Sequence, residues 1–158
     1  MANPNHGRRA VRREIAKALL AASEASNSVL SAPLVKDDKR AQPKPGETKT
    51  RLAVMPENTD IHQQYLGNEN DEHHHTIIIE WSVFVASGLS PEIRENTYER
   101  GLNEIAGVLT ADIGFNGTCA YSKPSKLEEV DEDYGSAGAL SAGFIFMTIL
   151  LDSASVLA

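Results

Sequence analysis

Apolar and polar side chains alternate most regularly between residues 76 and 86. Every odd position of Thr76–Ala86 up to Val85 is apolar, while the even positions mix Thr76, Glu80 and Ser82 with apolar residues. A period of two with β-branched and aromatic residues is typical of a β-strand. The pattern predicts a strand with one fully buried face and one mixed face.

The next pattern has a helical period. After a turn at Gly88, Ser90 is placed to cap a helix, Pro91 suits its first position and Glu92 suits its positive end. At 100° per residue one side of this segment is apolar, comprising Tyr98, Leu102, Ile105 and Leu109. The sequence therefore predicts an amphipathic helix that follows the strand and ends near Leu109.

A second amphipathic helix is predicted at Arg8–Ser23. Its apolar stripe comprises Val11, Ile15, Ala18, Leu19 and Ala22, and Arg9, Arg13 and Lys17 lie opposite, four residues apart. Stacked like charges cost a few tenths of a kcal/mol each. The stripe therefore suggests an anionic partner, either nucleic acid or the acidic part of a neighbouring copy; a solvated helix face is the alternative.

The last predicted strand, Gly138–Asp152, is apolar on both faces. Leu140, Phe144, Phe146 and Leu150 share one face, and Ile145, Met147, Ile149 and Leu151 share the other. Such a strand is either central in a covered sheet or lies at a subunit interface.

The segments between these elements have weaker patterns. We expect a short edge strand from Val29, Leu30, Leu34 and Val35, followed by a long charged loop at Lys36–Lys49. Two short strands should follow at Thr50–Met55 and Thr59–Leu66. Pro56 either ends the strand Thr50–Met55 or places it at a sheet edge. Pro124 makes Thr118–Val130 an edge or bulged strand, and Glu128–Asp133 is expected as an acidic tip.

The resulting fold class is α+β. We expect one domain over residues 1–158, with a mostly antiparallel or mixed sheet of four to five strands. The N-terminal helix and the central helix should pack on one face of that sheet.

Composition places the chain among ordinary globular proteins, but its charge is divided unevenly. The net charge is −7, yet residues 1–51 hold 11 Lys/Arg against 5 Asp/Glu, and residues 52–158 hold 4 against 17. No apolar run reaches membrane-span length, no secretory signal pattern is present, and one cysteine, Cys119, fits a reducing compartment. The chain is expected to be made in a cytoplasm and not to enter a membrane.

Few residues are candidates for chemistry. In a strand, His73 and His75 would share a face and could hold zinc with a nearby carboxylate, but a third ligand at suitable spacing is missing, so a structural role is favoured. The acidic run Glu128–Asp133 lacks the spacing and glycine of a calcium loop. Cys119 has no basic neighbour that would activate it. We therefore expect no catalysis, no metal and no cofactor.

The order of elements resembles a known family. A basic N-terminal helix is followed by a short strand that ends in a proline turn (Arg51–Pro56) and by a long strand with the sequence TIIIEWSVFVA. A helix that begins with SPEI comes next. The chain then continues with an edge strand, an acidic segment and an apolar terminal strand. This succession is similar to the tail terminator proteins of long-tailed bacteriophages, the family of the phage lambda tail terminator. The longer loop at Lys36–Lys49 and the extension Ser153–Ala158 depart from it.

The resemblance implies a virion protein without enzymatic activity. It implies a homo-hexameric ring on the last ring of the tail tube, which stops tube polymerisation and offers a surface to head-completion proteins of the neck. Genome DNA would pass through the lumen without specific binding. The alternatives are another neck ring (head-closure or head–tail connector), a metal-binding domain at the histidines, or a nucleic-acid-binding module, which the acidic body disfavours.

Two groups of residues are predicted to serve such a ring. Subunit contacts are expected from Arg9, Arg13 and Lys17 against acidic groups of a neighbour, and from Phe84, Phe144 and Phe146. An acidic lumen is expected from Glu128, Glu129, Asp131, Glu132 and Asp133, which would repel DNA phosphates.

Overall fold

The computed structural model describes residues 8–33, 48–61 and 72–152. In chain order the elements are α1 (Arg8–Ser23), β1 (Thr48–Ile61), β2 (Glu72–Val85), α2 (Pro91–Ala111), β3 (Tyr121–Asp133), a short 3₁₀ turn (Gly135–Ala137) and β4 (Ala139–Asp152). The predicted α+β class is confirmed, with a four-stranded antiparallel sheet, an N-terminal helix and a central helix.

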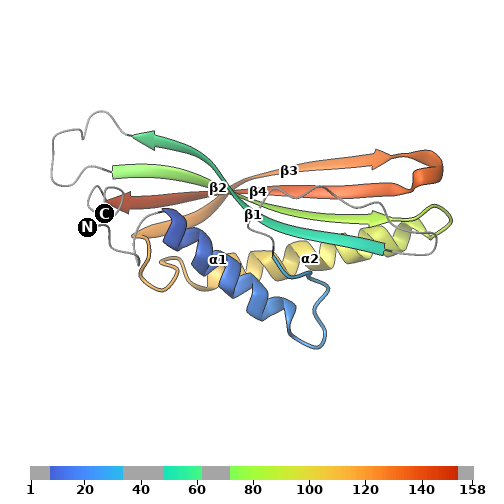
Figure 1. The fold of residues 1–158 in the computed structure, drawn as a ribbon, viewed down its shortest axis with the longest axis horizontal. Coiled ribbons are helices and arrows are strands. Elements are labelled where there is room, and N and C mark those ends of the chain that lie inside the picture. The colour runs from blue at the N-terminus through green and yellow to red at the C-terminus, as the bar shows by residue number, and fades with distance from the viewer. Residues whose placement is uncertain (1–7, 34–47, 62–71, 153–158) are drawn as a thin grey trace.

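The four strands lie in the order β1-β2-β4-β3, and every neighbouring pair is antiparallel. β1 and β2 form one long hairpin and β3 and β4 form the other, so the two inner strands are β2 and β4 (Figure 1). Strands of 13 or 14 residues extend about 45 Å, whereas the 16 residues of α1 extend about 24 Å. Both helices that the structure describes lie below the sheet in Figure 1, on the same face of it.

The main core lies between the sheet and the helices. The odd positions of β2, from Ile77 to Val85, are at most 3% exposed, as the alternation predicts. They pack with Val11, Ile15 and Leu19 of α1, Ile105 and Leu109 of α2, and Ile145, Met147, Ile149 and Leu151 of β4. The predicted faces of both central strands and the apolar stripe of α1 are thus confirmed.

Helix α2 is held close to the sheet by two glycines. Trp81 lies against Gly101, and its indole Nε1 donates a hydrogen bond to the Tyr98 carbonyl at 3.1 Å. On the neighbouring strand β4, a Cβ at Gly143 would lie 2.6 Å from Tyr98 Oη. The helix therefore approaches β2 and β4 more closely than side chains at these two positions would allow.

The prediction for the segment after α1 was wrong where the structure describes it. Residues Val29 and Leu30 form no strand, whereas Leu34 and Val35 lie outside the described residues. The segment instead crosses α2, because Ser28 Oγ donates to Glu104 at 2.7 Å and Arg100 donates to the Asn27 carbonyl at 2.9 Å. These bonds hold Asn27 and Ser28 against α2.

Two further boundaries need correction. β1 is one strand from Thr48 to Ile61, with a register shift between Pro56 and Thr59, so Thr48 and Lys49 belong to a strand and residues 50–61 form one strand instead of two. Residues 36–47 of the predicted loop and 62–66 of the second predicted strand lie outside the described residues. An edge strand tolerates proline because its outer N–H groups need no partner within the sheet. The acidic run Glu128–Asp133 lies within β3 and pairs along β4, so it is not a tip.

Candidate functional site

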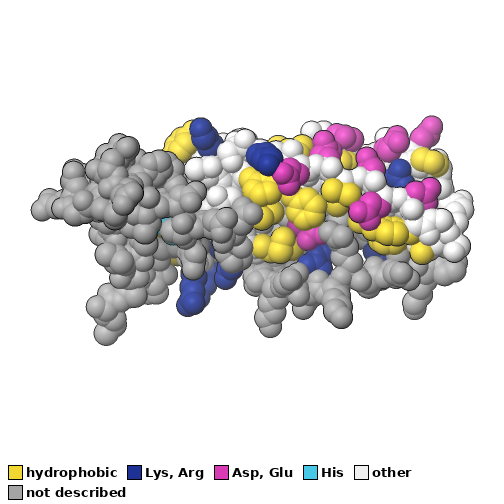
Figure 2. Space-filling model, turned by 90° about the horizontal axis from the view of Figure 1, so that it is seen from above, with side chains coloured by type: hydrophobic (Ala, Val, Ile, Leu, Met, Phe, Trp, Pro, Cys, Tyr) yellow, Lys and Arg dark blue, Asp and Glu magenta, His cyan; other side chains and the backbone are white. Residues whose placement is uncertain are grey.

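The sheet face opposite the helices, called here the open face, is the first candidate site. Strand register places on it Met55 of β1, Ile78, Glu80, Ser82 and Phe84 of β2, Leu140, Ala142, Phe144 and Phe146 of β4, and Lys126, Glu128, Val130 and Glu132 of β3. Figure 2 shows hydrophobic side chains along the middle of this face and acidic side chains around and to one side of them.

The three predicted interface aromatics all lie on the open face, but they differ in exposure. Phe84 is buried with Leu140 and Ala142, and its ring stacks on Tyr134 at a centroid distance of 5.6 Å. Phe144 and Phe146 are half-buried, and Lys126 Nζ lies 5.4 Å from the centre of the Phe146 ring. Phe144 and Phe146 are therefore more available to a partner than Phe84.

A buried ion pair crosses the open face from β1 to β2. Arg51 Nε lies 3.4 Å from Glu80 Oε2, and the two side chains are 10% and 5% exposed. Burying the two charges costs free energy, because both lose their contacts with water. The attraction between the guanidinium and the carboxylate offsets part of this cost. The pair joins neighbouring strands and has no evident catalytic arrangement.

The basic stripe of α1 is exposed, as the helical period predicts. Arg9, Arg13 and Lys17 all point away from the core, and the apolar Leu20, which is 41% exposed, lies in the same row. Side chains that are three or four residues apart in sequence lie on the same side of a helix. The stripe is therefore free of the core and available to a partner.

The acidic residues of β3 lie on both faces of the strand. Register places Glu128 and Glu132 on the open face and Glu129, Asp131 and Asp133 on the helix side. Several have partners within the chain: Tyr98 donates to Glu129 at 2.7 Å, Ser141 donates to Asp131 at 2.6 Å, and Lys126 pairs with Glu128 at 2.5 Å. They nonetheless stay exposed and form one acidic edge of the sheet.

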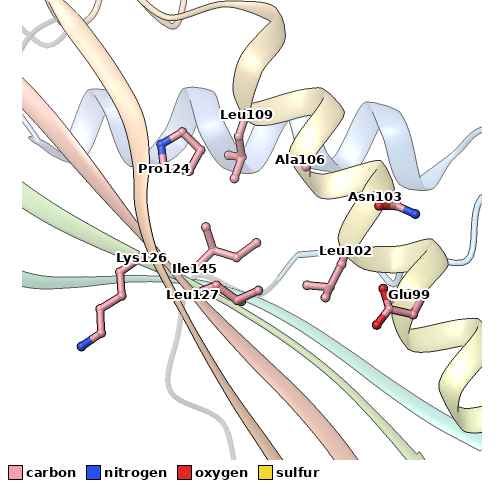
Figure 3. A pocket seen from close by; sticks show the side chains of 9 residues that line it. All are labelled: Glu99, Leu102, Asn103, Ala106, Leu109, Pro124, Lys126, Leu127 and Ile145. Atoms are coloured by element: carbon pink, nitrogen blue, oxygen red, sulfur yellow. The ribbon is translucent and has the colours of Figure 1, made fainter.

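A groove of about 450 Å³ lies between α2 and β3, and the sequence patterns did not predict it. Its apolar floor is formed by Leu102, Ala106, Leu109, Pro124, Leu127 and Ile145. Its polar edge is formed by Glu99, Asn103 and Lys126. In Figure 3 the leucines, Pro124 and Ile145 point into the gap, whereas Lys126 and Asn103 point away. Leu127 is 47% exposed there.

Two titratable groups among the described residues, Cys119 and Tyr98, have shifted pKa values, and neither shift activates a nucleophile. Burial and then the Asp112 carboxylate raise the pKa of the Cys119 thiol to about 11, so its reactive thiolate is scarce at neutral pH. Burial and the Glu129 carboxylate raise the pKa of Tyr98 far above its ordinary value. Both groups are therefore neutral at physiological pH.

The histidine cluster was the candidate metal site. Residues 73 and 75 pair with Leu151 and Ile149 of β4, and the His75 side chain is only 4% exposed. Over the part of the chain that the structure describes, no three His, Cys, Asp or Glu side chains come together as a metal group. The His73 side chain lies outside the described residues.

None of the helices that the structure describes is long and apolar enough to cross a membrane. No protein-family model matches the chain, and no curated protein matches it.

Proposed function

We propose that this chain is a structural subunit of a bacteriophage virion, a ring protein that caps the head-proximal end of the tail tube. The observation that carries the proposal is apolar surface on the open face: the two helices that the structure describes lie on the opposite face, and Phe144 and Phe146 are only half-buried. Apolar surface of this kind is typical of interaction sites. The resemblance in element order to phage tail terminators names the class of assembly.

In this proposal six copies form a closed ring by head-to-tail contacts. Such contacts use two different surfaces of each copy, and they close when the rotation between neighbours permits. The uneven charge supplies two unlike surfaces, a basic α1 and an acidic β3. The exposed stripe Arg9, Arg13 and Lys17 belongs to the first surface.

The ring would act by stacking and blocking. One ring face binds the last ring of tube protein, and the other lacks the tube's self-complementary surface, so growth stops and neck proteins can attach. Carboxylates of β3 that line the lumen, Glu128 and Glu132 among them, would repel DNA phosphates, so the genome slides through without specific binding. Assembly would take place in the host cytoplasm, and the protein would remain in the virion.

The direct test is a polymerisation assay with purified tube protein of the same phage. Adding this chain at about one hexamer per tube should stop elongation, and negative-stain images should show a cap at one tube end. Unchanged tube lengths with bare ends would contradict the proposal. In that case binding to purified connector or portal rings would indicate another neck ring, and stoichiometric zinc would indicate a metal-binding domain.

A further inference from the structure

The helix layer covers the sheet unevenly. α1 packs against β1 and α2, whereas α2 packs mainly on β2 and β4 and contacts β3 little. Across the sheet order β1-β2-β4-β3, the helix layer therefore runs α1, α2 and then the groove. Among the described helices, α2 makes the main contact with β3, and that contact is small, so the groove between α2 and β3 lies on this side of the helix layer (Figure 3).

The surroundings of this groove are acidic. Glu99 lies at its edge, Glu95 is exposed one turn earlier on α2, and Glu129 and Asp131 lie on the helix side of β3. α2 has four Asp/Glu and two Lys/Arg, and β3 has five and two, so together they carry a net charge of −5. An occupant of the groove should therefore be basic, with some apolar surface for the floor.

α1 of a second copy has that chemistry. It has five Lys/Arg and one Glu, a net charge of +4, and its exposed row combines Arg9, Arg13 and Lys17 with the exposed Leu20. Opposite net charges on two surfaces favour their encounter and fix their relative orientation.

The layer order makes this contact geometrically simple. If a second copy lies beside the first with its β1 next to β3, its α1 would come to the groove side of the sheet, because α1 packs against β1. Because the donor helix and the acceptor groove are different surfaces, each copy can use both at once, as a ring requires.

We infer that the groove between α2 and β3 is the acceptor site for α1 of a neighbouring copy. This inference rests on the proposed ring and names the surfaces that join its subunits. The basic stripe meets the acidic edges of the groove, and Leu20 lies toward Leu127.

Cysteine cross-linking tests the contact directly. Full-length Leu20→Cys and Leu127→Cys variants are prepared separately, mixed under assembling conditions at about pH 8 and oxidised with diamide. The raised pKa of Cys119, about 11, keeps the native thiol slow. The mixture should give a disulfide-linked dimer containing one chain of each variant, and the double variant should give a ladder of linked chains.

The matched control is Ile93→Cys in place of Leu127→Cys. Ile93 lies on the same helix layer and is similarly exposed, at 43% against 47%, but does not line the groove. Leu20→Cys mixed with Ile93→Cys should give no dimer of the two. Equal cross-linking with both partners would show random collision and overturn the inference.

A charge exchange gives a second readout that does not depend on thiols. Arg13→Glu and Glu99→Arg should each raise the protein concentration at half-assembly by on the order of threefold to tenfold, and the two together should restore it.

A ring that forms without the Leu20–Leu127 link and without this rescue overturns the inference and leaves the ring proposal standing. A cross-linked ring that ignores tubes supports the inference and removes the tail-cap function. A chain that stays monomeric alone and with tubes removes both.

Discussion

Gly101 is the residue at which local preference and packing disagree most. Glycine inside a helix costs about 1 kcal/mol relative to alanine. Here the cost is offset, because the backbone of α2 lies against the Trp81 ring and a Cβ would collide with it. The close approach also lets Trp81 donate its hydrogen bond to the Tyr98 carbonyl.

Replacing Gly101 with alanine should therefore destabilise the protein in spite of the better helix propensity. We expect Gly101→Ala to lower the free energy of unfolding by about 1–3 kcal/mol, because an overpacked contact must be relieved by movement of Trp81 or of the helix. Urea unfolding followed by tryptophan fluorescence measures this, since Trp81 is the only tryptophan.

Gly107 provides the matched control on the same helix. It is exposed, and a Cβ there would meet nothing within 4 Å. Gly107→Ala should raise the free energy of unfolding by up to about 1 kcal/mol. Similar changes of the same sign in both variants would contradict the packing described at Trp81.

At the level of elements, the ion pair between Arg51 and Glu80 fixes β1 against β2. Glu80→Gln should lower the free energy of unfolding by about 3 kcal/mol, because it removes the carboxylate charge that lies 3.4 Å from the buried guanidinium. Denaturant titration at neutral pH measures the change.

The control replaces both partners with apolar residues of similar size. The double variant Arg51→Met with Glu80→Leu should be closer to the parent in stability than Glu80→Gln, because both charges of the pair are removed together. If Glu80→Gln alone changes stability by less than about 0.5 kcal/mol, the ion pair does not hold the two strands together in the way described.

The elements that the sequence predicted well are those that meet the core. The strand around Trp81, the capped helix and the terminal strand each bury a regular row of side chains, so their periods are visible in the sequence. β3 has no such row: apart from Ser122 its residues are exposed on both faces, and its acidic end was therefore expected as a tip. Pro56 likewise hid the continuity of β1, since an edge strand tolerates a proline that a central strand would not.

The candidate sites were predictable to different degrees. The exposure of Arg9, Arg13 and Lys17 follows from helical period alone. The groove beside Leu127 could not be found in the same way, because it depends on strand order and on which strands α2 covers. The covering of Phe84 by Tyr134 depends on the turn between β3 and β4, which residue types do not specify.

For the whole molecule, we propose that the chain works as a ring and not as a single subunit. The half-buried aromatics on the open face, the groove between α2 and β3 and the opposite charges on α1 and β3 all support assembly with further copies. Each of these features would be completed by a neighbour in a head-to-tail ring.

The most direct test of this claim is the mass of the purified full chain in solution, measured by light scattering over a range of concentrations, alone and with tail tubes. We expect six copies of the 17.1 kDa chain, about 103 kDa, with six-fold rings in negative stain, either free or at one tube end. A mass of about 17 kDa at every concentration, together with tubes that remain bare, would contradict it.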